Sequence, residues 1–394
     1  MDEMKIVFVS SEVVPFSKTG GLADVSGTLP VALARLGHEV TVVTPCYLTV
    51  DRKRYGLRQI FGRGEIPGLG GADVWEAFMR SDAAKVRVLF IGAAAFDRQG
   101  LYQDNGRDYP DNEERFSFFS RATLALLKHL SIHPDVIHVN DWQTALIPVY
   151  LKTHYLSDGF FSRTGTLLSI HNLAFQGVFP AAHFRALALA PRLFTPDGLE
   201  FYGKINLLKG GIVFSDVLTT VSPGYAREIQ VKAGGCGLDG VLSSRKHTLC
   251  GILNGIDYDE WNPGKGSGLF PDYGPDRMSG KAEAKKILME KLGIRGPESA
   301  PLLGAVTRLD PQKGCDILLR AIFRLLPKTD AQFALLGTGL RELEAAFGNL
   351  ARQFPGRVGL ALKFDSGLAK LIYAGSDFFL MPSIFEPCGL GQMI

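Results

Sequence analysis

The chain has 394 residues, a length that predicts two domains rather than a single core. Hydrophobic residues make up 46% and charged residues 21%, which is the composition of a globular enzyme rather than of a disordered chain. The formal net charge of +3 is too small to indicate a nucleic-acid partner, so any preference for anions is expected to come from local clusters of cations.

Cysteine usage and the N-terminus both predict a cytoplasmic location. The five cysteines are scattered and never spaced as Cys-x-x-Cys, which argues against a disulfide framework or a zinc site. The first residues lack the basic start of a signal peptide, and no run approaches the roughly 20 apolar residues that a membrane helix needs. We therefore expect no membrane partner, while the oligomeric state stays open.

The first 255 residues alternate between strand-like and helix-like segments. Short β-branched runs, typical of strands buried on both faces of a parallel sheet, lie at Ile6–Val9, Val40–Val43, Val86–Ile91, Val136–Val139, Thr166–Ile170, Val217–Val221 and Leu249–Leu253. Helical periods separate several of them: leucines at 22, 29, 33 and 36 end at Gly37, a second stripe spans Phe116–Leu130, and Ser222-Pro223 predicts another helix start. This alternation predicts a doubly wound α/β domain, in which ligands collect beyond the carboxyl ends of the strands.

Two segments rich in glycine and proline interrupt this rhythm. Gly62–Gly71 is expected to form a mobile loop, and Asn262–Pro275 separates the two halves, with a hinge that starts at Asn254-Gly255. After a helix near Lys281–Leu292, strands are predicted at Leu302–Val306, Phe333–Leu336, Val358–Leu362 and Phe378–Met381. We therefore predict an N-terminal domain at 1–255, a connecting segment at 256–300 and a second domain at 301–394, whose sheet looks incomplete.

The segment Ser17–Asp24 follows the first strand and precedes the first helix. Its paired glycines, Gly20 and Gly21, allow close approach of a ligand, the helix presents free N–H groups, and Lys18 adds a mobile positive charge. Together these features predict an anion site, with phosphate as the expected ligand. Glycines that merely make the bend are the alternative, because neither the P-loop spacing nor Gly-x-Gly-x-x-Gly is present.

Polar residues follow most of the other predicted strands. Asp141 and His171 follow two strands of the first domain, and Arg308 and Lys313 follow the first strand of the second. Each has a structural alternative: Asp141 as a helix N-cap, His171 as a satisfied structural histidine, and the two cations as solvated surface charges. Their shared location at strand ends favours a common cleft, in which the two cations clamp a diphosphate.

Several motifs in collinear order resemble those of the bacterial and plant glycogen/starch synthases. They are Lys18–Val25, His171–Gly177, Asn254–Asp257, Arg308–Gly314 and Glu386–Leu390, and the stretch Leu199–Gln230 is similar to the same family. The resemblance implies the GT-B architecture, in which two Rossmann-like doubly wound α/β domains face a central cleft. It also implies a retaining glucosyltransferase that moves glucose from ADP-glucose to the non-reducing end of an α-1,4-glucan, with neither a metal nor another cofactor.

The same resemblance implies roles for individual residues. Lys18, Gly20 and Gly21 would meet the donor diphosphate and glucose, and Arg308 and Lys313 would stabilise the leaving ADP, as fixed cations must where no metal acts. His171 would bind the glucose, and Asp141 would orient the donor sugar or the acceptor. The remaining expected donor residues are Asn254, Glu386, Cys388, Gly389 and Leu390, and Glu12 and Tyr102 are expected on the acceptor side.

Three alternatives stay open. Another GT-B transferase with a UDP-sugar donor would carry similar motifs, because base choice depends on contacts that the sequence does not reveal. A dinucleotide-dependent oxidoreductase would also use two Rossmann-like halves, although the missing Gly-x-Gly-x-x-Gly argues against it. Finally, the family continues beyond Glu386–Leu390, so we expect the chain to be C-terminally truncated, and an inactive fragment is the third alternative.

Overall fold

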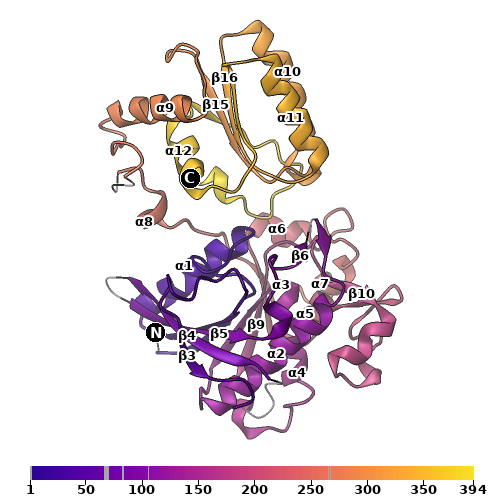
Figure 1. The fold of residues 1–394 in the computed structure, drawn as a ribbon. Coiled ribbons are helices and arrows are strands. Elements are labelled where there is room, and N and C mark those ends of the chain that lie inside the picture. The colour runs from indigo at the N-terminus through magenta and orange to yellow at the C-terminus, as the bar shows by residue number, and fades with distance from the viewer. Residues whose placement is uncertain (1, 66–70, 82–83, 105, 265, 267) are drawn as a thin grey trace. The chain divides into compact units, whose positions relative to one another are not determined.

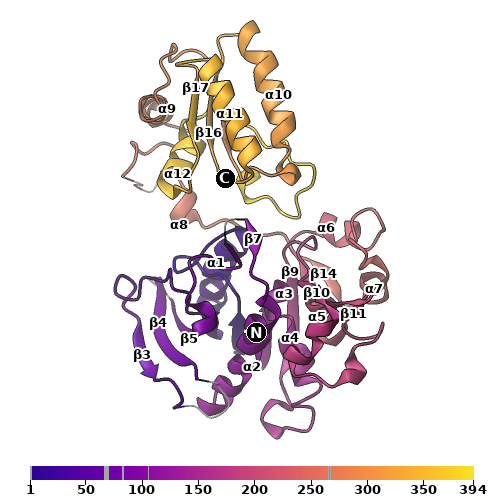
Figure 2. The same ribbon diagram turned by 45° about the vertical axis from the view of Figure 1, so that its right-hand side comes forward.

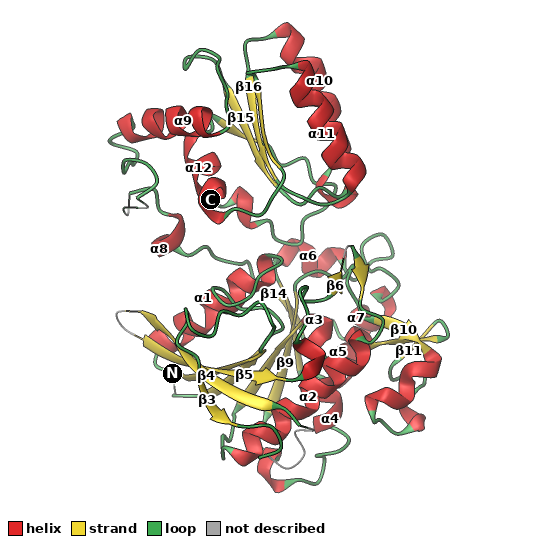
Figure 3. Cartoon of the chain, in the orientation of Figure 1, coloured by secondary structure: helices red, strands yellow, loops and turns green. Residues whose placement is uncertain are grey.

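The computed structural model describes residues 2–65, 71–81, 84–104, 106–264, 266 and 268–394. The chain divides into two compact units, Met1–Asn254 (unit 1) and Gly255–Ile394 (unit 2). Each unit contains a largely parallel sheet with helices packed around it (Figure 1 and Figure 3). Among the helices that the structure describes, none is both long enough and apolar enough to cross a membrane.

A nine-stranded sheet forms the centre of unit 1, in the order β14-β13-β9-β8-β1-β2-β5-β4-β3. Its strands are β1 (Lys5–Val9), β2 (Glu39–Pro45), β3 (Arg58–Phe61), β4 (Asp73–Ser81), β5 (Ala84–Gly92), β8 (Val136–Asn140), β9 (Gly165–Ile170), β13 (Val217–Thr220) and β14 (Leu249–Gly251). Neighbours from β14 to β5 pair in parallel, as predicted. The strand order reverses between β1 and β8, and in such sheets the carboxyl ends of the strands at this switch point are where ligands bind.

The antiparallel strands β3 and β4 were not predicted from the sequence. Glu76 lies in the middle of β4 and interrupts its apolar pattern, yet its side chain is buried. It is held by ion pairs to Arg58 on β3 (2.6 Å) and Arg87 on β5 (2.7 Å). A buried charge of this kind requires partners from neighbouring strands, and hydrophobic periodicity does not reveal them.

Helices and two small sheets complete unit 1. The α-helices are α1 (Gly21–Arg35), α2 (Asn112–His129), α3 (Asp141–Thr144), α4 (Leu146–Leu151), α5 (Leu207–Phe214), α6 (Pro223–Glu228) and α7 (Asp239–Ser244). The 3-10 helices are η1 (Ala94–Phe96), η2 (Gly159–Phe161), η3 (Ala181–Leu187) and η4 (Pro191–Leu193). The small sheets contain β6 (Gln103–Asp104) with β7 (Arg107–Asp108), and β10 (Val178–Pro180), β11 (Glu200–Phe201) and β12 (Lys204–Asn206).

The predicted end of α1 and the predicted start of α6 are confirmed. Gly37 follows α1 with a φ of +94°, the left-handed conformation that ends many helices, and its N–H donates to Ala34. Leu36 was expected on the buried stripe but is the C-cap residue and is 64% exposed. At α6, the Ser222 hydroxyl accepts from the N–H of Tyr225 and Pro223 occupies the first turn.

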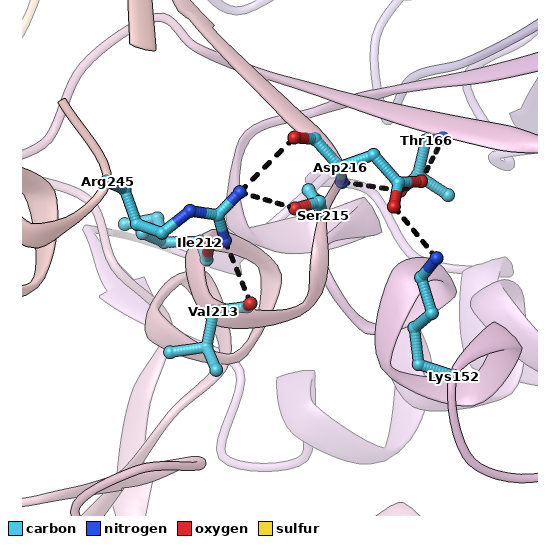
Figure 4. Close-up of polar contacts among 7 residues, drawn as sticks. All are labelled: Lys152, Thr166, Ile212, Val213, Ser215, Asp216 and Arg245. Carbon is cyan, nitrogen blue, oxygen red and sulfur yellow. Dashed lines mark hydrogen bonds and ion pairs between the residues drawn. The ribbon is translucent and has the colours of Figure 1, made fainter. Parts of the chain in front are cut away.

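Arg245 closes the C-terminal end of α5 (Figure 4). Its Nη1 donates to the carbonyl oxygens of Ile212 (2.7 Å) and Val213 (2.9 Å). Its Nη2 donates to those of Ser215 (2.6 Å) and Asp216 (3.3 Å). A cation at this end satisfies carbonyl groups that lack helical partners and interacts favourably with the helix dipole.

Asp216 ties the amino ends of β9 and β13 together in the same cluster (Figure 4). One carboxylate oxygen accepts from both the N–H and the hydroxyl of Thr166 at 2.8 Å, and the other accepts from Lys152 at 2.8 Å. These contacts lie at the amino ends of the strands, opposite the edge where ligands are expected. Asp216 and the end of α5, which belong to the Leu199–Gln230 motif, therefore have a structural role.

Unit 2 is built on a four-stranded parallel sheet in the order β17-β16-β15-β18. Its strands are β15 (Leu302–Val306), β16 (Gln332–Leu336), β17 (Val358–Ala361) and β18 (Phe378–Phe379). Its helices are α8 (Tyr258–Trp261), α9 (Ser279–Lys291), α10 (Cys315–Leu325), α11 (Arg341–Gln353) and α12 (Ser366–Gly375), with 3-10 helices η5 (Pro311–Lys313), η6 (Leu326–Lys328) and η7 (Leu390–Gln392). All four predicted strands are present.

The strands of unit 2 send alternate side chains into two cores. Leu303 and Leu335 pack with residues of α10 and α11 on one face, and Leu302 and Leu336 pack with residues of α9 and α12 on the other. Figure 2 shows these helix pairs on opposite sides of the sheet. Burial on both faces explains why these strands are continuous apolar runs in the sequence.

Two predicted strands end two residues earlier than expected. Strand β14 ends at Gly251, and the predicted strand residues Ile252 and Leu253 are each 59% exposed. Strand β18 contains only Phe378–Phe379, so the predicted extension to Met381 is wrong. Of the predicted glycine-rich loop, residues 66–70 lie outside the described residues, as do 265 and 267 of the predicted connecting segment.

Candidate active site

The loop between β1 and α1 is organised by Glu12. The carboxylate of this buried residue accepts hydrogen bonds from the N–H of Thr19 (2.5 Å), the hydroxyl of Thr19 (2.7 Å) and the N–H of Gly20 (3.1 Å). The hydroxyl of Tyr102 also donates to it at 2.8 Å and lies 2.7 Å from the hydroxyl of Ser11. Glu12 and Tyr102, both expected on the acceptor side, are thus joined to each other and to the lysine- and glycine-containing loop.

Lys18 is held over the first turn of α1. Its ammonium group lies 2.5 Å from a carboxylate oxygen of Asp24, and both side chains remain partly exposed. Gly20, the N-cap of α1, has extended backbone, and a Cβ built at this position would meet no atom within 4 Å. The space next to Gly20 and the unsatisfied N–H groups of the helix start are compatible with the predicted anion site.

The ends of β8 and β9 are joined through three polar residues, beside the switch point between β1 and β8. Asp141 Oδ1 accepts the N–H of His171 at 2.7 Å, and Asn140 Oδ1 lies 2.9 Å from His171 Nε2. Asn140 is fully buried, and its Nδ2 donates to the carbonyl oxygen of Val9 on β1 at 3.0 Å. Consecutive residues of one strand end therefore hold both the backbone and the side chain of His171.

Asp141 occupies an unusual position. It has a φ of +55° at the junction between β8 and α3, a conformation uncommon for residues other than glycine. The N-cap of α3 is Asn140. The Asp141 carboxylate instead accepts the N–H of His171, the residue after β9, so the N-cap alternative for Asp141 is wrong. Burial raises the pKa of the Asp141 carboxyl to about 7, although the N–H groups of His171 and Asn172 act in the opposite direction.

Gln176 and Gly177, the last two residues of the His171–Gly177 motif, are structural in this unit. The buried Gln176 accepts from Asn206 Nδ2 at 2.6 Å and donates to the carbonyl oxygens of Leu173 and Cys236. Gly177 has a φ of +63°, and a Cβ at this position would lie 2.5 Å from the Trp142 ring. Only glycine fits that close approach.

In unit 2, the Arg308–Gly314 motif forms a tight turn after β15. The Asp310 carboxylate caps η5 by accepting the N–H of Lys313 at 3.1 Å. Gly314 has a φ of +63°, and a Cβ there would lie 2.0 Å from the Pro382 carbonyl oxygen. The turn fixes the backbone of Lys313 against the segment that carries Glu386.

Lys313 and Glu386 form a partly buried ion pair. Lys313 Nζ lies 2.6 Å from Glu386 Oε1, which also accepts the hydroxyl of Ser383 at 2.6 Å. Arg308 lies on the same turn, 49% exposed, with its guanidinium 3.3 Å from Asp310. Because Lys313 is mostly covered and held by a carboxylate, it differs from the solvated surface charge considered as its alternative.

Glycines near the end of the chain pack closely against other segments. A Cβ at Gly389 would lie 2.2 Å from the Met381 side chain, and Leu390 begins η7. Cys388 is partly exposed. Asn254 is the last residue of unit 1 and lies in the loop after β14.

Within the described ranges of the chain, no group of three or more His, Cys, Asp or Glu side chains is placed to bind a metal ion.

Sequence reasoning assigned no role to Asn140, Ser383 or Asp24, which contact His171, Glu386 and Lys18. Asn140 directly precedes Asp141, but nothing in the sequence shows which atom its amide would meet. The contacts of Ser383 and Asp24 depend on the conformations of their loops, which periodicity does not predict.

Comparison with known proteins identifies the family. Residues 5–244 match the family model "Starch synthase catalytic domain", and residues 300–393 match "Glycosyl transferases group 1". The chain is 47% identical to a glycogen synthase of Geotalea daltonii over 393 residues (99% of this chain, 81% of the relative) and 46% identical to a glycogen synthase of Thermotoga maritima over 398 residues (99% and 80%).

A solved structure shows the same fold. The catalytic domain of starch synthase IV from Arabidopsis thaliana, bound to ADP and acarbose, matches with a TM-score of 0.91 at 35% identity, covering 100% of this chain and 80% of that one. The predicted GT-B fold class, with two Rossmann-like units, is thereby confirmed. The chain therefore belongs to the glycogen and starch synthase family of glycosyltransferases.

Proposed function

We propose that this chain transfers glucose from ADP-glucose to the non-reducing end of an α-1,4-glucan, with retention at the anomeric carbon. Membership of the glycogen and starch synthase family makes it a glucosyltransferase of glycogen or starch synthesis that uses a nucleotide-sugar donor and a glucan acceptor. The Arabidopsis relative was solved with ADP, the nucleotide that ADP-glucose leaves behind, which supports adenine as the base.

The observation that carries the proposal is the cation pair on the turn after β15. Loss of a nucleoside diphosphate from a sugar places negative charge on the leaving group, and that charge needs stabilisation in the transition state. Arg308 and Lys313 lie on a turn fixed by Asp310 and Gly314. We assign to these two cations the stabilisation of the leaving ADP, a role that a divalent ion plays in other transferases.

The carboxylate beside each lysine fits this role. Glu386 holds Lys313 and Asp24 holds Lys18, so each ammonium group is positioned before the donor arrives. A bound diphosphate would compete with these carboxylates for the two ammonium groups. We assign Glu386, with Cys388, Gly389 and Leu390, to the donor sugar and phosphate.

In unit 1, we assign Lys18, Gly20 and Gly21 to the donor diphosphate and Asn254 to the donor. His171 would bind the transferred glucose. Asp141, whose carboxylate holds the backbone of His171, would orient the donor sugar or the acceptor. Glu12 and Tyr102, joined by a hydrogen bond, are proposed on the acceptor side.

The assay uses radiolabelled ADP-glucose, glycogen and an excess of chelator. We expect label in the polymer at a rate that the chelator does not change. Two lysine variants of unit 2 are compared. Lys313→Ala is expected to lose glucosyl transfer, whereas Lys328→Ala, which replaces an exposed lysine, is expected to retain it. Absence of label would contradict the assignment, sensitivity to chelator would contradict metal-free transfer, and faster transfer from UDP-glucose would favour a UDP-sugar enzyme.

A further inference from the structure

We propose that Asn140 is a positioning residue that fixes His171 as the Nε2–H tautomer, so that Nδ1 accepts a hydrogen bond from a hydroxyl of the transferred sugar. This inference rests on the proposed role of His171 in binding glucose. It adds which ring nitrogen of His171 accepts the sugar hydroxyl and which residue sets the tautomer of the ring.

The orientation of the Asn140 amide follows from its buried surroundings. Asn140 is fully buried, so each of its amide groups must find a partner within the protein. The carbonyl oxygen of Val9 lies 3.0 Å from Nδ2 and can only accept, so the NH₂ group must face Val9. A reversed amide would place two acceptor oxygens against each other, and the Oδ1 atom therefore faces His171.

The tautomer of His171 follows from this orientation. Asn140 Oδ1 lies 2.9 Å from His171 Nε2 and is an acceptor, so Nε2 must carry the hydrogen. Burial lowers the pKa of His171 to about 4, which leaves the ring uncharged near neutral pH. A neutral ring protonated on Nε2 has a lone pair on Nδ1, and among the described residues no hydrogen bond reaches Nδ1.

The backbone of Asn140 is held by contacts separate from those of its side-chain amide. Its N–H donates to the hydroxyl of Thr144 at 2.6 Å, and that hydroxyl donates back to the Asn140 carbonyl oxygen at 2.8 Å. Asp141, the next residue, holds the backbone N–H of His171. His171 is therefore held at its ring and at its backbone, and a sugar hydroxyl that donates to Nδ1 would meet a fixed acceptor, which lowers the entropy lost on binding.

The first test is spectroscopic. In protein labelled with ¹⁵N-histidine, the His171 signals are assigned by their absence in His171→Gln. At pH 7 we expect a protonated-type shift for Nε2 and an unprotonated-type shift for Nδ1. A protonated Nδ1, or an imidazolium, in the unsubstituted protein would overturn the inference, and this measurement does not require any Asn140 variant to fold.

The second test compares Asn140→Leu with Thr144→Val. The leucine is close in size but offers no acceptor, so we expect averaged tautomer shifts and a loss of about tenfold in kcat/KM for the donor, equivalent to one hydrogen bond. Thr144→Val disturbs the backbone contacts of Asn140 but leaves its amide intact, and we expect the wild-type spectrum. Wild-type tautomer shifts in Asn140→Leu would overturn the inference.

The two proposals fail in different ways. Glucosyl transfer by the unsubstituted protein without the Nε2–H tautomer overturns the inference alone. The predicted tautomer in a protein that does not transfer glucose overturns the proposed function alone. Full activity of His171→Gln would overturn the role of His171 and, with it, the positioning role of Asn140.

Discussion

Replacement of Asp141 by asparagine is expected to change how the stability of unit 1 depends on pH. Burial raises the pKa of the Asp141 carboxyl from 3.8 to about 7 in the folded protein. Between these values the folded state binds a proton that the unfolded state has lost, so stability falls as the pH rises. The Asp141→Asn variant has no such proton, and its amide oxygen can still accept the N–H of His171.

The magnitude follows from the size of the pKa shift. Raising the pKa from 3.8 to about 7 corresponds to about 4 kcal/mol of destabilisation above pH 7, and about 3 kcal/mol of it develops between pH 5 and pH 8. Burial lowers the pKa values of His138 and His171 to about 3 and about 4, which has the opposite effect on the pH dependence. Those contributions are common to both proteins and cancel in the difference between variant and wild type.

The assay is urea unfolding at pH 5 and pH 8, with pulsed hydrogen exchange of peptides from β8 and β9 to follow unit 1. We expect the variant to gain about 3 kcal/mol relative to wild type between the two pH values. Asp108→Asn, which removes a carboxyl at an exposed position of the same unit, is the control. An Asp141→Asn difference that is the same at pH 5 and pH 8 would refute the argument.

Three further substitutions test the assignments and the packing. Lys18→Gln should mainly raise the donor KM if the ammonium contacts the phosphates equally in ground and transition states, and a matching fall in kcat would show instead that it acts on the leaving charge. Lys313→Ala should lower kcat by about 10²–10³-fold by analogy with loss of an oxyanion donor, and unchanged steady-state kinetics would contradict its role. Gly177→Ala should lower the free energy of unfolding by about 1–3 kcal/mol, because the added Cβ would lie 2.5 Å from the Trp142 ring and the backbone has a φ of +63°. Calorimetry that shows no fall in Tm would contradict this expectation.

Much of the fold could be predicted because its parallel strands are buried on both faces. Strands such as β1 and β15 are continuous apolar runs, which hydrophobic periodicity detects. Strand β4 could not be found in this way, because the charge of Glu76 is buried only with the help of Arg58 and Arg87 from its neighbours. The end of β14 was also misplaced, since Ile252 and Leu253 are apolar but exposed.

The candidate site was predictable as a set of positions but not as a set of contacts. The polar residues that follow parallel strands could be located, since the carboxyl ends of such strands share one edge of the sheet. Which group each one meets depends on packing between segments far apart in the chain. Asp141 illustrates this limit: its sequence context suggested a helix cap, but a left-handed backbone turns its carboxylate toward the N–H of His171, thirty residues away.

The hydrogen bonds of Glu12 reduce the number of backbone N–H groups that could bind an anion at the predicted site. A backbone N–H that donates to a carboxylate is not free for a phosphate, and Glu12 occupies those of Thr19 and Gly20. Because the N–H of Ala23 already donates to the carbonyl oxygen of Gly20 at 3.3 Å, the N–H groups of Gly21 and Leu22 are the ones left at the positive end of this fifteen-residue helix. Anion binding at this loop would therefore depend on the start of α1 and on Lys18, while Glu12 holds the preceding backbone in the conformation that brings the two together.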